Sequence, residues 1–503
     1  MFPTPSLFLA ALLGLSLATG LPGWAQQPAG NEAKGTGTTV LPGRPPYSIL
    51  REQENFAFLR PDSLRARPVP PDLFDPLKYV PLGRRPGYFL TVGLDVRYQY
   101  EVIKNDDWGA GVPPDAPPAN GYLLQRHMVH TDWRLGPHLR VFGQLLSDNV
   151  AGRRGGPRPQ IDRDGLDVYQ VFVEGSTSLG PQGRAELRVG RQEFLYGSER
   201  LLSMREGPNV RQSFDAARLA LTYPGWRVDL LVGRPLLTQA GVLDDRGDPQ
   251  QVLWGAYAVR TLKQLRGGLD VYYFGLNKHN AVFLQGVGHE QRQTVGTRFW
   301  RKETPAHPFG YNAELIGQLG RFGAGQIRAY YASGIVYYQV ARWPLTPTFR
   351  FATDAISGDH DRRNPDLQAF NALFARPFFG NAITPIGPGN LLDLHPGVEL
   401  HLQPRMTLAV DVDWLWRASP QDVIYGPATI PIIPVSDAPG VPGRPLPARR
   451  YIGRQLTVDW AWQASRHLAL GFTYAWLPAG DYVRDTTPGR TLSYYKPTVL
   501  FQF

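Results

Sequence analysis

Residues 184–223 read RAELRVGRQEFLYGSERLLSMREGPNVRQSFDAARLALTY, which predicts a strand, a long charged loop and a second strand. In both arms apolar residues alternate with charged or small polar ones, the period of two that is typical of a β-strand. A soluble antiparallel sheet buries the apolar face and exposes the charged one. A transmembrane barrel reverses this, because apolar residues meet lipid and charged residues line a wet interior. The rest of the chain has to distinguish the two.

The composition favours a membrane barrel. Apolar residues make up 43% of the chain and aromatic residues 12%, with 23 Tyr and 12 Trp, and the formal net charge is +10. Aromatic enrichment suits both β-sheets and the interfacial belts of membrane barrels. Outside the first residues, no stretch has the roughly 18 consecutive apolar residues of a membrane helix. A membrane-spanning protein of this composition therefore has to cross with strands.

The amino terminus carries an export signal. Residues 7–18 form a short apolar core, and Gly23 and Ala25 supply small side chains before a cleavage site at Gln26, so residues 1–25 are predicted to be a cleavable signal peptide. The segment before the apolar core has no Lys or Arg. The whole chain has no cysteine. A closed barrel suits an exported chain without disulfides, since every strand edge is paired.

The chain divides into two parts after the signal. Residues 26–87 are rich in Pro, Gly and Arg and predict an irregular periplasmic extension, whereas residues 88–503 alternate and predict the barrel. The predicted strands lie near residues 88–101, 121–135, 138–148, 166–176, 184–194, 212–223, 226–234, 251–261, 268–276, 291–300, 310–319, 325–335, 349–356, 397–403, 405–417, 451–462, 466–477 and 490–503.

The connections between these strands alternate in length. Short turns are predicted at 136–137, 224–225, 403–404 and 464–465, and long loops at 103–120, 148–165, 195–211, 235–250, 277–290, 357–396, 418–450 and 478–489. One connection, 320–324, is short where a long loop is due. Short periplasmic turns and long extracellular loops are the arrangement of an outer-membrane barrel. We therefore predict an all-β fold, a single transmembrane antiparallel β-barrel of about 18 strands in the bacterial outer membrane.

The carboxyl terminus supports export to that membrane. The chain ends TLSYYKPTVLFQF, an alternating strand that closes on Phe503. A terminal strand ending in Phe resembles the signal by which the barrel assembly machinery recognises outer-membrane proteins. The alternative is an ordinary last strand without a recognition role.

Three regions of the sequence resemble one family. They are FDPLKYVPLG at 74–83; VGRQE at 189–193 with REGPNVR at 205–211 and SFD at 213–215; and SGD at 357–359 with FNALF at 370–374, FFG at 378–380 and NLLDLHP at 390–396. These stretches resemble the alginate export family of outer-membrane proteins. The resemblance implies an 18-stranded barrel whose positively charged channel passes the polyanion alginate outward, although relatives can carry other solutes.

The strand parity puts a set of arginines on the face opposite the apolar residues. Guanidinium groups in a confined channel present forked donors to carboxylates, so these residues are candidates for the solute pathway. The alternative is that they solvate the lumen and tie strands together through ion pairs with acids such as Asp411 and Asp413, which share the inward parity. The candidate arginines are Arg97, Arg126, Arg134, Arg140, Arg188, Arg218, Arg292, Arg298 and Arg328.

Two loops have candidate roles. The loop at 195–212 carries Arg200, Arg205, Glu206 and Arg211 and either folds inward as a constriction or remains a solvated surface loop. The oxygen-rich loop at 358–366 could hold Ca²⁺, but it lacks the spacing and closing Glu of an EF-hand. A solvated loop is the favoured interpretation there.

Transport is the function that these patterns indicate. The sequence has no nucleophile elbow, P-loop or dinucleotide fingerprint, so we expect no enzyme activity, cofactor or metal centre. The leading hypothesis is a channel for an anionic polysaccharide, alginate-like, or a small anion. The alternatives are a general diffusion porin and a barrel enzyme or adhesin. Expected partners are outer-membrane lipid, the transported anion, the barrel assembly machinery and periplasmic export proteins, with no nucleic acid.

Overall fold

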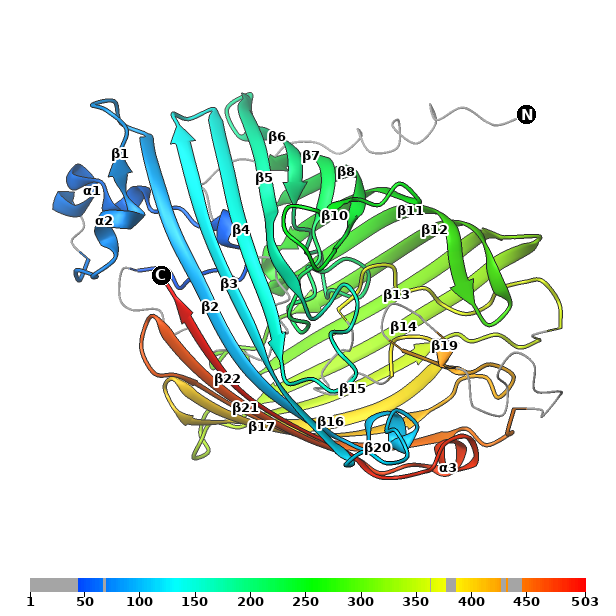
Figure 1. The fold of residues 1–503 in the computed structure, drawn as a ribbon. Coiled ribbons are helices and arrows are strands. Elements are labelled where there is room, and N and C mark those ends of the chain that lie inside the picture. Colours follow the sequence, from blue (N-terminus) through cyan, green and yellow to red (C-terminus); the bar gives the residue numbers. More distant parts are fainter. Residues whose placement is uncertain (1–43, 67–68, 362, 377–385, 427–430, 433–445) are drawn as a thin grey trace, which may run out of the picture.

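The computed structural model describes residues 44–66, 69–361, 363–376, 386–426, 431–432 and 446–503. Over these residues the chain forms one closed antiparallel β-barrel of 18 strands, which confirms the predicted fold class (Figure 1). The predicted signal peptide, the extension up to residue 43 and the FFG motif at 378–380 lie outside the described residues.

The barrel strands follow one another in chain order, each paired with the next. They are β2 (Tyr88–Lys104), β3 (Ala119–Leu135), β4 (Leu139–Ala151), β5 (Asp164–Leu179), β6 (Gly183–Gln192), β7 (Phe214–Tyr223), β8 (Trp226–Leu237), β10 (Gln251–Leu262), β11 (Gly267–Phe283), β12 (Gly286–Arg301), β13 (Phe309–Phe322), β14 (Gly325–Gln339), β15 (Thr348–Ile356), β16 (Leu391–Gln403), β17 (Met406–Trp416), β20 (Tyr451–Gln463), β21 (Leu468–Leu477) and β22 (Leu492–Gln502).

Several short elements are not part of the barrel wall. They are α1 (Pro61–Ala66), α2 (Asp75–Lys78), α3 (Asp481–Thr486), the 3-10 helices Arg51–Gln53, Ala57–Leu59, Asp106–Gly109 and Lys263–Leu265, and the two-residue strands β1 (Val80–Pro81), β9 (Arg246–Gly247), β18 (Ile424–Tyr425) and β19 (Pro431–Ile432). Among the described residues, none of the helices has the length and apolarity needed to cross a membrane.

The barrel closes between its first and last strands. β2 and β22 are antiparallel, with Asp95 opposite Gln502 and Lys104 opposite Ser493. Phe503 extends this seam, because its backbone N–H donates to Leu94 O and the Leu94 N–H donates to Phe503 O, each at 3.0 Å. Closure leaves neither terminal strand with an open edge.

One predicted long loop is wrong. Residues 277–290 continue β11 and β12 as a paired hairpin, with Lys278 opposite Glu290 and a bulge between Lys278 and Ala281. The stretch reads as a loop because it is polar, yet its side chains still alternate: Phe283 is buried and His279 is exposed, stacked on His289 with ring centroids 4.8 Å apart. Polar residues on the outer face of a strand do not prevent it from pairing.

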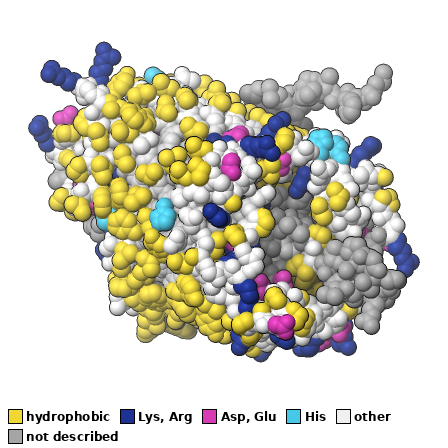
Figure 2. Space-filling model, viewed as in Figure 1, with side chains coloured by type: hydrophobic (Ala, Val, Ile, Leu, Met, Phe, Trp, Pro, Cys, Tyr) yellow, Lys and Arg dark blue, Asp and Glu magenta, His cyan; other side chains and the backbone are white. Residues whose placement is uncertain are grey.

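The two faces of the wall settle which kind of barrel this is. On β6, Leu187 and Val189 are 50% and 53% exposed on the outside, while Arg188 between them is 4% exposed on the inside. Figure 2 shows the result as a broad apolar surface over the strands. Gly190 keeps this strand close to β5, because its φ of +134° and the backbone of Val171 and Phe172 leave no space for a Cβ. The inverted pattern is that of a barrel in lipid.

The N-terminal segment lies at the end of the barrel where the chain also finishes (Figure 1). β1 pairs with the start of β2, Val80 opposite Leu90, and residues 49–54 reach the inner face of the wall, where Arg140 Nη2 donates to Glu52 O at 2.5 Å. The same end carries the short turns, so the segment enters the barrel from the side predicted to be periplasmic.

Lys78 makes the docking of this segment depend on pH. The ammonium is buried, donates to Val92 O at 2.9 Å and faces Arg51, Glu54, Asp95, Arg466 and His130. Burial, with Arg51, lowers its pKa to about 7. The undocked lysine therefore holds a proton that the docked one releases, and docking strengthens as pH rises through 7 toward the ordinary lysine pKa.

We expect hydrogen exchange in residues 44–60, corrected for the intrinsic rate, to be slower at pH 9 than at pH 6. Lys78→Met should remove this difference because the methionine does not titrate. A pH dependence that survives in Lys78→Met would assign the effect to another group.

Candidate functional site

The loop between β6 and β7, residues 193–213, lies inside the barrel and is called the constriction loop below. At one end, Arg200 Nε donates to the Tyr331 hydroxyl of β14 at 3.1 Å and its Nη1 donates to Glu314 of β13 at 3.4 Å. At the other end, the loop contacts β2 and β3, on a different part of the wall. The loop is thus held across the lumen by contacts with two separate parts of the wall.

Glu206 is held by three arginines. Its Oε1 lies 2.8 Å from Arg126 Nη1 and 3.3 Å from Arg97 Nη1, and its other oxygen pairs with Arg211. Burial opposes the charge of Glu206, but Arg126, Arg211 and Arg97 outweigh burial and lower its pKa to about 2. Three guanidinium groups therefore surround one carboxylate beside the wall of β2 and β3, and Arg211 also lies 3.4 Å from Glu193.

Arg97 and Arg126 also bind the backbone of the constriction loop. Arg126 donates from Nε to Asn209 O at 2.7 Å and from Nη2 to Pro208 O at 2.6 Å, and Arg97 Nη2 donates to Pro208 O at 3.0 Å. In the reverse direction, Asn209 Nδ2 donates to Gln125 O of β3 at 3.1 Å. In this structure the two arginines therefore position the loop, and they are bound to it instead of facing an open pore.

Most of the other predicted arginines lie on the inner face and are paired with acids. The pairs, with their closest N–O distances, are Arg134 and Asp132 at 3.1 Å, Arg140 and Asp132 at 2.7 Å, Arg188 and Glu174 at 2.7 Å, Arg292 and Glu290 at 2.5 Å, and Arg298 and Asp270 at 3.1 Å. For these residues the structure shows the ion-pairing role that the sequence left open as an alternative.

Two arginines differ from that set. Arg218 lies half-buried opposite Arg188 in the register of β6 and β7, and no carboxylate lies within ion-pair distance of it in the described part of the chain. Arg205, in the constriction loop, lies over the Phe374 ring at 5.9 Å and likewise has no acidic partner among the described residues. Burial lowers the pKa of Arg205 to about 10, so it remains charged at neutral pH. Arg218 still interacts electrostatically with Glu174 and Asp229 at longer range.

The prediction for Arg328 is wrong. In β14 the buried inner positions are Ile327, Ala329 and Tyr331, and Arg328 shares the outer face with the exposed Tyr330. Arg328 Nη2 donates to Gln326 at 3.0 Å on the same face. The side chain lies near the long-loop end of its strand, where a polar outer face is compatible with water, and parity alone does not show where the membrane band ends.

Tyrosines are the functional side chains that the sequence interpretation missed. Their hydroxyls donate to lumen carboxylates: Tyr122 and Tyr494 to Glu101 at 2.7 Å, Tyr257 to Asp270 at 2.6 Å, Tyr272 to Glu314 at 2.6 Å and Tyr196 to Asp229 at 2.9 Å. The sequence assigned tyrosine to outer belts. Their inward parity beside acids, as for Tyr272 two residues after Asp270, was the available signal.

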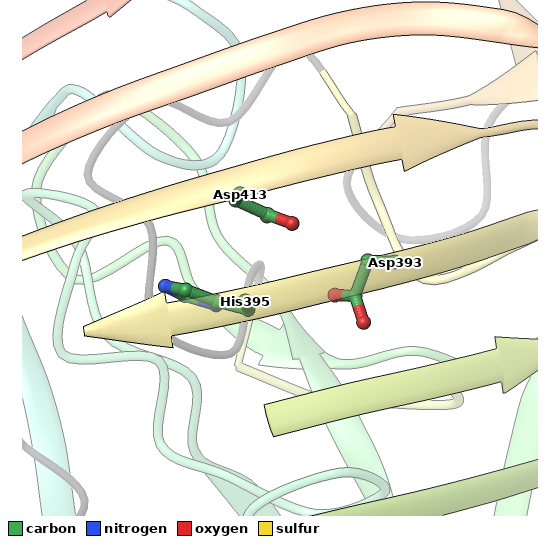
Figure 3. Close-up of side chains that lie close together, drawn as sticks. All are labelled: Asp393, His395 and Asp413. Carbon is green, nitrogen blue, oxygen red and sulfur yellow. The ribbon is translucent and has the colours of Figure 1, made fainter. Parts of the chain in front are cut away.

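The wall opposite these arginines is acidic. Asp393 and His395 of β16 and Asp413 of β17 are buried on the inner face, with one ligand atom of each within 4.8 Å of the others (Figure 3). Asp411, predicted to face inward with Asp413, lies 3.7 Å from Arg350 and 3.6 Å from His395. Acids therefore lie along β16 and β17, whereas β2–β7 carry arginines together with acids such as Asp95, Asp132 and Glu174.

The oxygen-rich loop at 358–366 uses its acids to hold the chain. The backbone N–H of Asp361 donates to Asp359 Oδ1 at 2.8 Å, and that of Asp359 donates to Asp422 Oδ2 at 2.8 Å. In the described residues of this loop, no three acids converge on a common point. Such contacts account for the acids as turn-forming groups.

The comparisons with known proteins agree with this architecture. Residues 88–495 match the family model described as alginate export. A comparison with curated proteins gives no match. Three similar solved structures come from Pseudomonas aeruginosa, and each aligns over 82% of this chain: OpdO (TM-score 0.55, 9% identity, 97% of that chain), OpdK with vanillate (0.54, 11%, 98%) and OccK2, or OpdF, in complex with glucuronate (0.52, 10%, 98%). At these identities the likeness shows the fold.

The family match covers the whole barrel from the start of β2 to Tyr495 in the last strand. It agrees with the closed 18-stranded wall, its apolar outer face and its charged lumen. The protein belongs to the alginate export family and is an outer-membrane β-barrel of porin architecture.

Proposed function

We propose that the protein is a passive outer-membrane channel for an anionic solute that carries carboxylates, such as a uronate-containing polysaccharide or a smaller acid. The observation that carries the proposal is that two lumen arginines, Arg205 and Arg218, form no ion pair among the described residues, beside the three arginines that bind Glu206. Transport, and not catalysis, is the role that such an arrangement serves.

The chemistry of the loop suits a carboxylate. Glu206 shows how Arg97, Arg126 and Arg211 bind one carboxylate, and Arg205 and Arg218 add charges that form no ion pair with the described residues. Guanidinium groups bind carboxylates through short, directional, charge-assisted hydrogen bonds. OpdK was solved with vanillate and OccK2 with glucuronate, both carboxylates, which supports the same class of ligand for a barrel of this fold.

Arg218 and Arg188 give a matched pair for testing this function. Each fixed charge changes the energy of an anion 4 Å away by about 1 kcal/mol in bulk-like water and by about 4 kcal/mol at an effective dielectric of 20. Arg218 forms no ion pair with a described residue, so Arg218→Glu should lower the anion-to-cation permeability ratio several-fold at low salt while leaving the folded yield unchanged. High salt should reduce the effect by screening.

Arg188→Glu should behave differently. Arg188 is buried against Glu174 and over the Phe172 ring, 4.0 Å from its centroid, so a glutamate there places two acids together inside the wall. We expect its main effect to be loss of folded barrel, seen as loss of heat-modifiable migration on a gel. Selectivity is read from reversal potentials in planar bilayers.

A general diffusion porin is the second candidate, favoured by the pairing of most lumen arginines with acids. A reversal potential near zero in the parent channel, unchanged in Arg218→Glu, would support that candidate and reject anion preference.

A further inference from the structure

Residues 47–56 of the N-terminal segment, with the sequence YSILREQENF, lie against the inside of the barrel. Leu50, Arg51, Glu52 and Phe56 are each buried, with exposed fractions of 2–4%. Leu50 packs with Leu195 and Met204 of the constriction loop. The segment therefore shares a small apolar core with the loop, and the two obstacles in the lumen touch.

Lumen arginines bind this segment as they bind the constriction loop. Arg140 Nη2 donates to Glu52 O at 2.5 Å, Arg134 Nη2 donates to Glu54 O at 2.9 Å, and Arg211 Nη1 donates to Ile49 O at 3.4 Å. The backbone carbonyls of the segment thus accept hydrogen bonds from guanidinium groups that could otherwise donate to a solute carboxylate or hydroxyl.

The side chain of Glu52 supplies the matching charge. Its Oε1 lies 3.7 Å from Arg188 Nη1, and the side chain is 2% exposed. In this part of the wall, Asp132 and Glu174 are the acids that pair with Arg140 and Arg188. Glu52 brings a further carboxylate to Arg188, as a bound anion would.

The residues that follow the segment are tied to the barrel seam, so release of the segment can be local. The Phe74 ring stacks on Phe503 with centroids 4.2 Å apart. Release breaks only the bonds that Arg51 donates to Asp95 Oδ1 at 3.2 Å and to Phe503 O at 2.6 Å on this seam. β1 then joins the segment to β2. Residues 72–81 can therefore stay on the seam while residues 47–56 leave the lumen.

We propose that residues 47–56 are an internal plug that closes the periplasmic side of the channel by occupying its arginines, with Glu52 in the position of a solute carboxylate. The inference deepens the proposed function and rests on it, since it names the site that an anion arriving from the periplasm competes for. Anion binding to Arg188 and Arg140 displaces the plug, because both cannot use the same guanidinium groups at once.

The test is the conductance of single channels in planar bilayers. Deletion of residues 47–56 should raise conductance several-fold, because it removes the obstacle and exposes the arginines. Glu52→Gln should increase the frequency of openings, because it keeps the backbone contacts and removes only the charge near Arg188. The control is Gln53→Ala in the same segment; Gln53 is exposed, so this variant should match the parent.

A synthetic peptide with the sequence of residues 47–56 provides the rescue. Added on the periplasmic side, it should close the deletion variant, whereas a peptide with Glu52→Gln and Glu54→Gln should close it less well. A deletion variant that folds, conducts like the parent and ignores the peptide overturns the plug. If the deletion variant does not fold, the opening frequency of Glu52→Gln decides the test. A Glu52→Gln channel that opens no more often than the parent rejects the proposal.

Selectivity separates this test from that of the proposed function. If deletion raises the conductance but the channel shows no anion preference, the plug is supported and the anion channel is rejected. If the parent prefers anions and deletion leaves its conductance unchanged, the anion channel is supported and the plug is rejected.

Discussion

Glu206→Gln is expected to release the constriction loop and to produce a larger and more anion-selective channel. Glu206 pairs with Arg97, Arg126 and Arg211, and its replacement removes the carboxylate of Arg97 and Arg126 and leaves Arg211 only Glu193. Breaking a buried pair by removing one partner costs about 3–5 kcal/mol. We expect a cost of about 3 kcal/mol, at the lower end of that range, because the Glu206 side chain keeps 29% exposure.

The expected readouts are a several-fold rise in single-channel conductance and a reversal potential shifted toward that of the anion. The barrel itself should still migrate as a heat-modifiable band, since no strand pairing changes. Glu186→Gln is the matched control, because Glu186 lies on the inner face of β6 and pairs only with the exposed Arg184 among described residues. Equal conductance in both variants would show that Glu206 does not hold the loop.

The same group predicts how loop docking depends on pH. The pKa of Glu206 lies at about 2, below its ordinary value. Its contribution to docking is therefore complete above the ordinary glutamate pKa and is lost as pH falls toward 2. Between pH 5 and 8 the contribution of Glu206 should stay constant, so any change in conductance over that range belongs to another group, such as Lys78 or Glu193, whose pKa burial raises to about 8.

Deletion of Phe503 is expected to reduce the amount of assembled barrel strongly while leaving export intact. In the folded barrel, Phe503 exchanges two backbone hydrogen bonds with Leu94, receives one from Arg51 and stacks on Phe74. Its loss removes the final bonds of the seam together with the terminal aromatic residue that resembles an assembly signal. Assembly is measured as heat-modifiable protein in outer membranes, and export as processed precursor.

Phe74→Ala tests whether the effect comes from docking of the N-terminal segment on Phe503. It removes the stacked ring, 4.2 Å from that of Phe503, but leaves the terminal residue and its bonds to Leu94. If Phe503 acts through its seam bonds or as a recognition signal, Phe74→Ala should assemble normally and only the deletion should fail. Equal losses in both variants would assign the effect to docking of the N-terminal segment, and normal assembly of the deletion would reject both roles.

The barrel could be predicted from the sequence because its information is local. Alternation along β6 and β7 gives the strands, and the same period places Leu187 outside and Arg188 inside. Each strand needs only its own residues to show two faces, and the alternation of turn and loop lengths orients the whole set. The start of β2 at Tyr88 and the closing strand β22 before Phe503 could be predicted in the same way.

The content of the lumen was decided only by the tertiary structure. The sequence marks Arg97, Arg126 and Arg188 as inward, but their partners lie elsewhere in the chain, Glu206 and Pro208 in the constriction loop and Glu52 in the N-terminal segment. Irregular segments have no period that shows where they fold, so their position depends on which donors and apolar surfaces the finished barrel leaves unfilled. The position of a residue in the strand alternation determines which face of the wall its side chain lies on. Its partner is determined only by the folded barrel and the segments inside it.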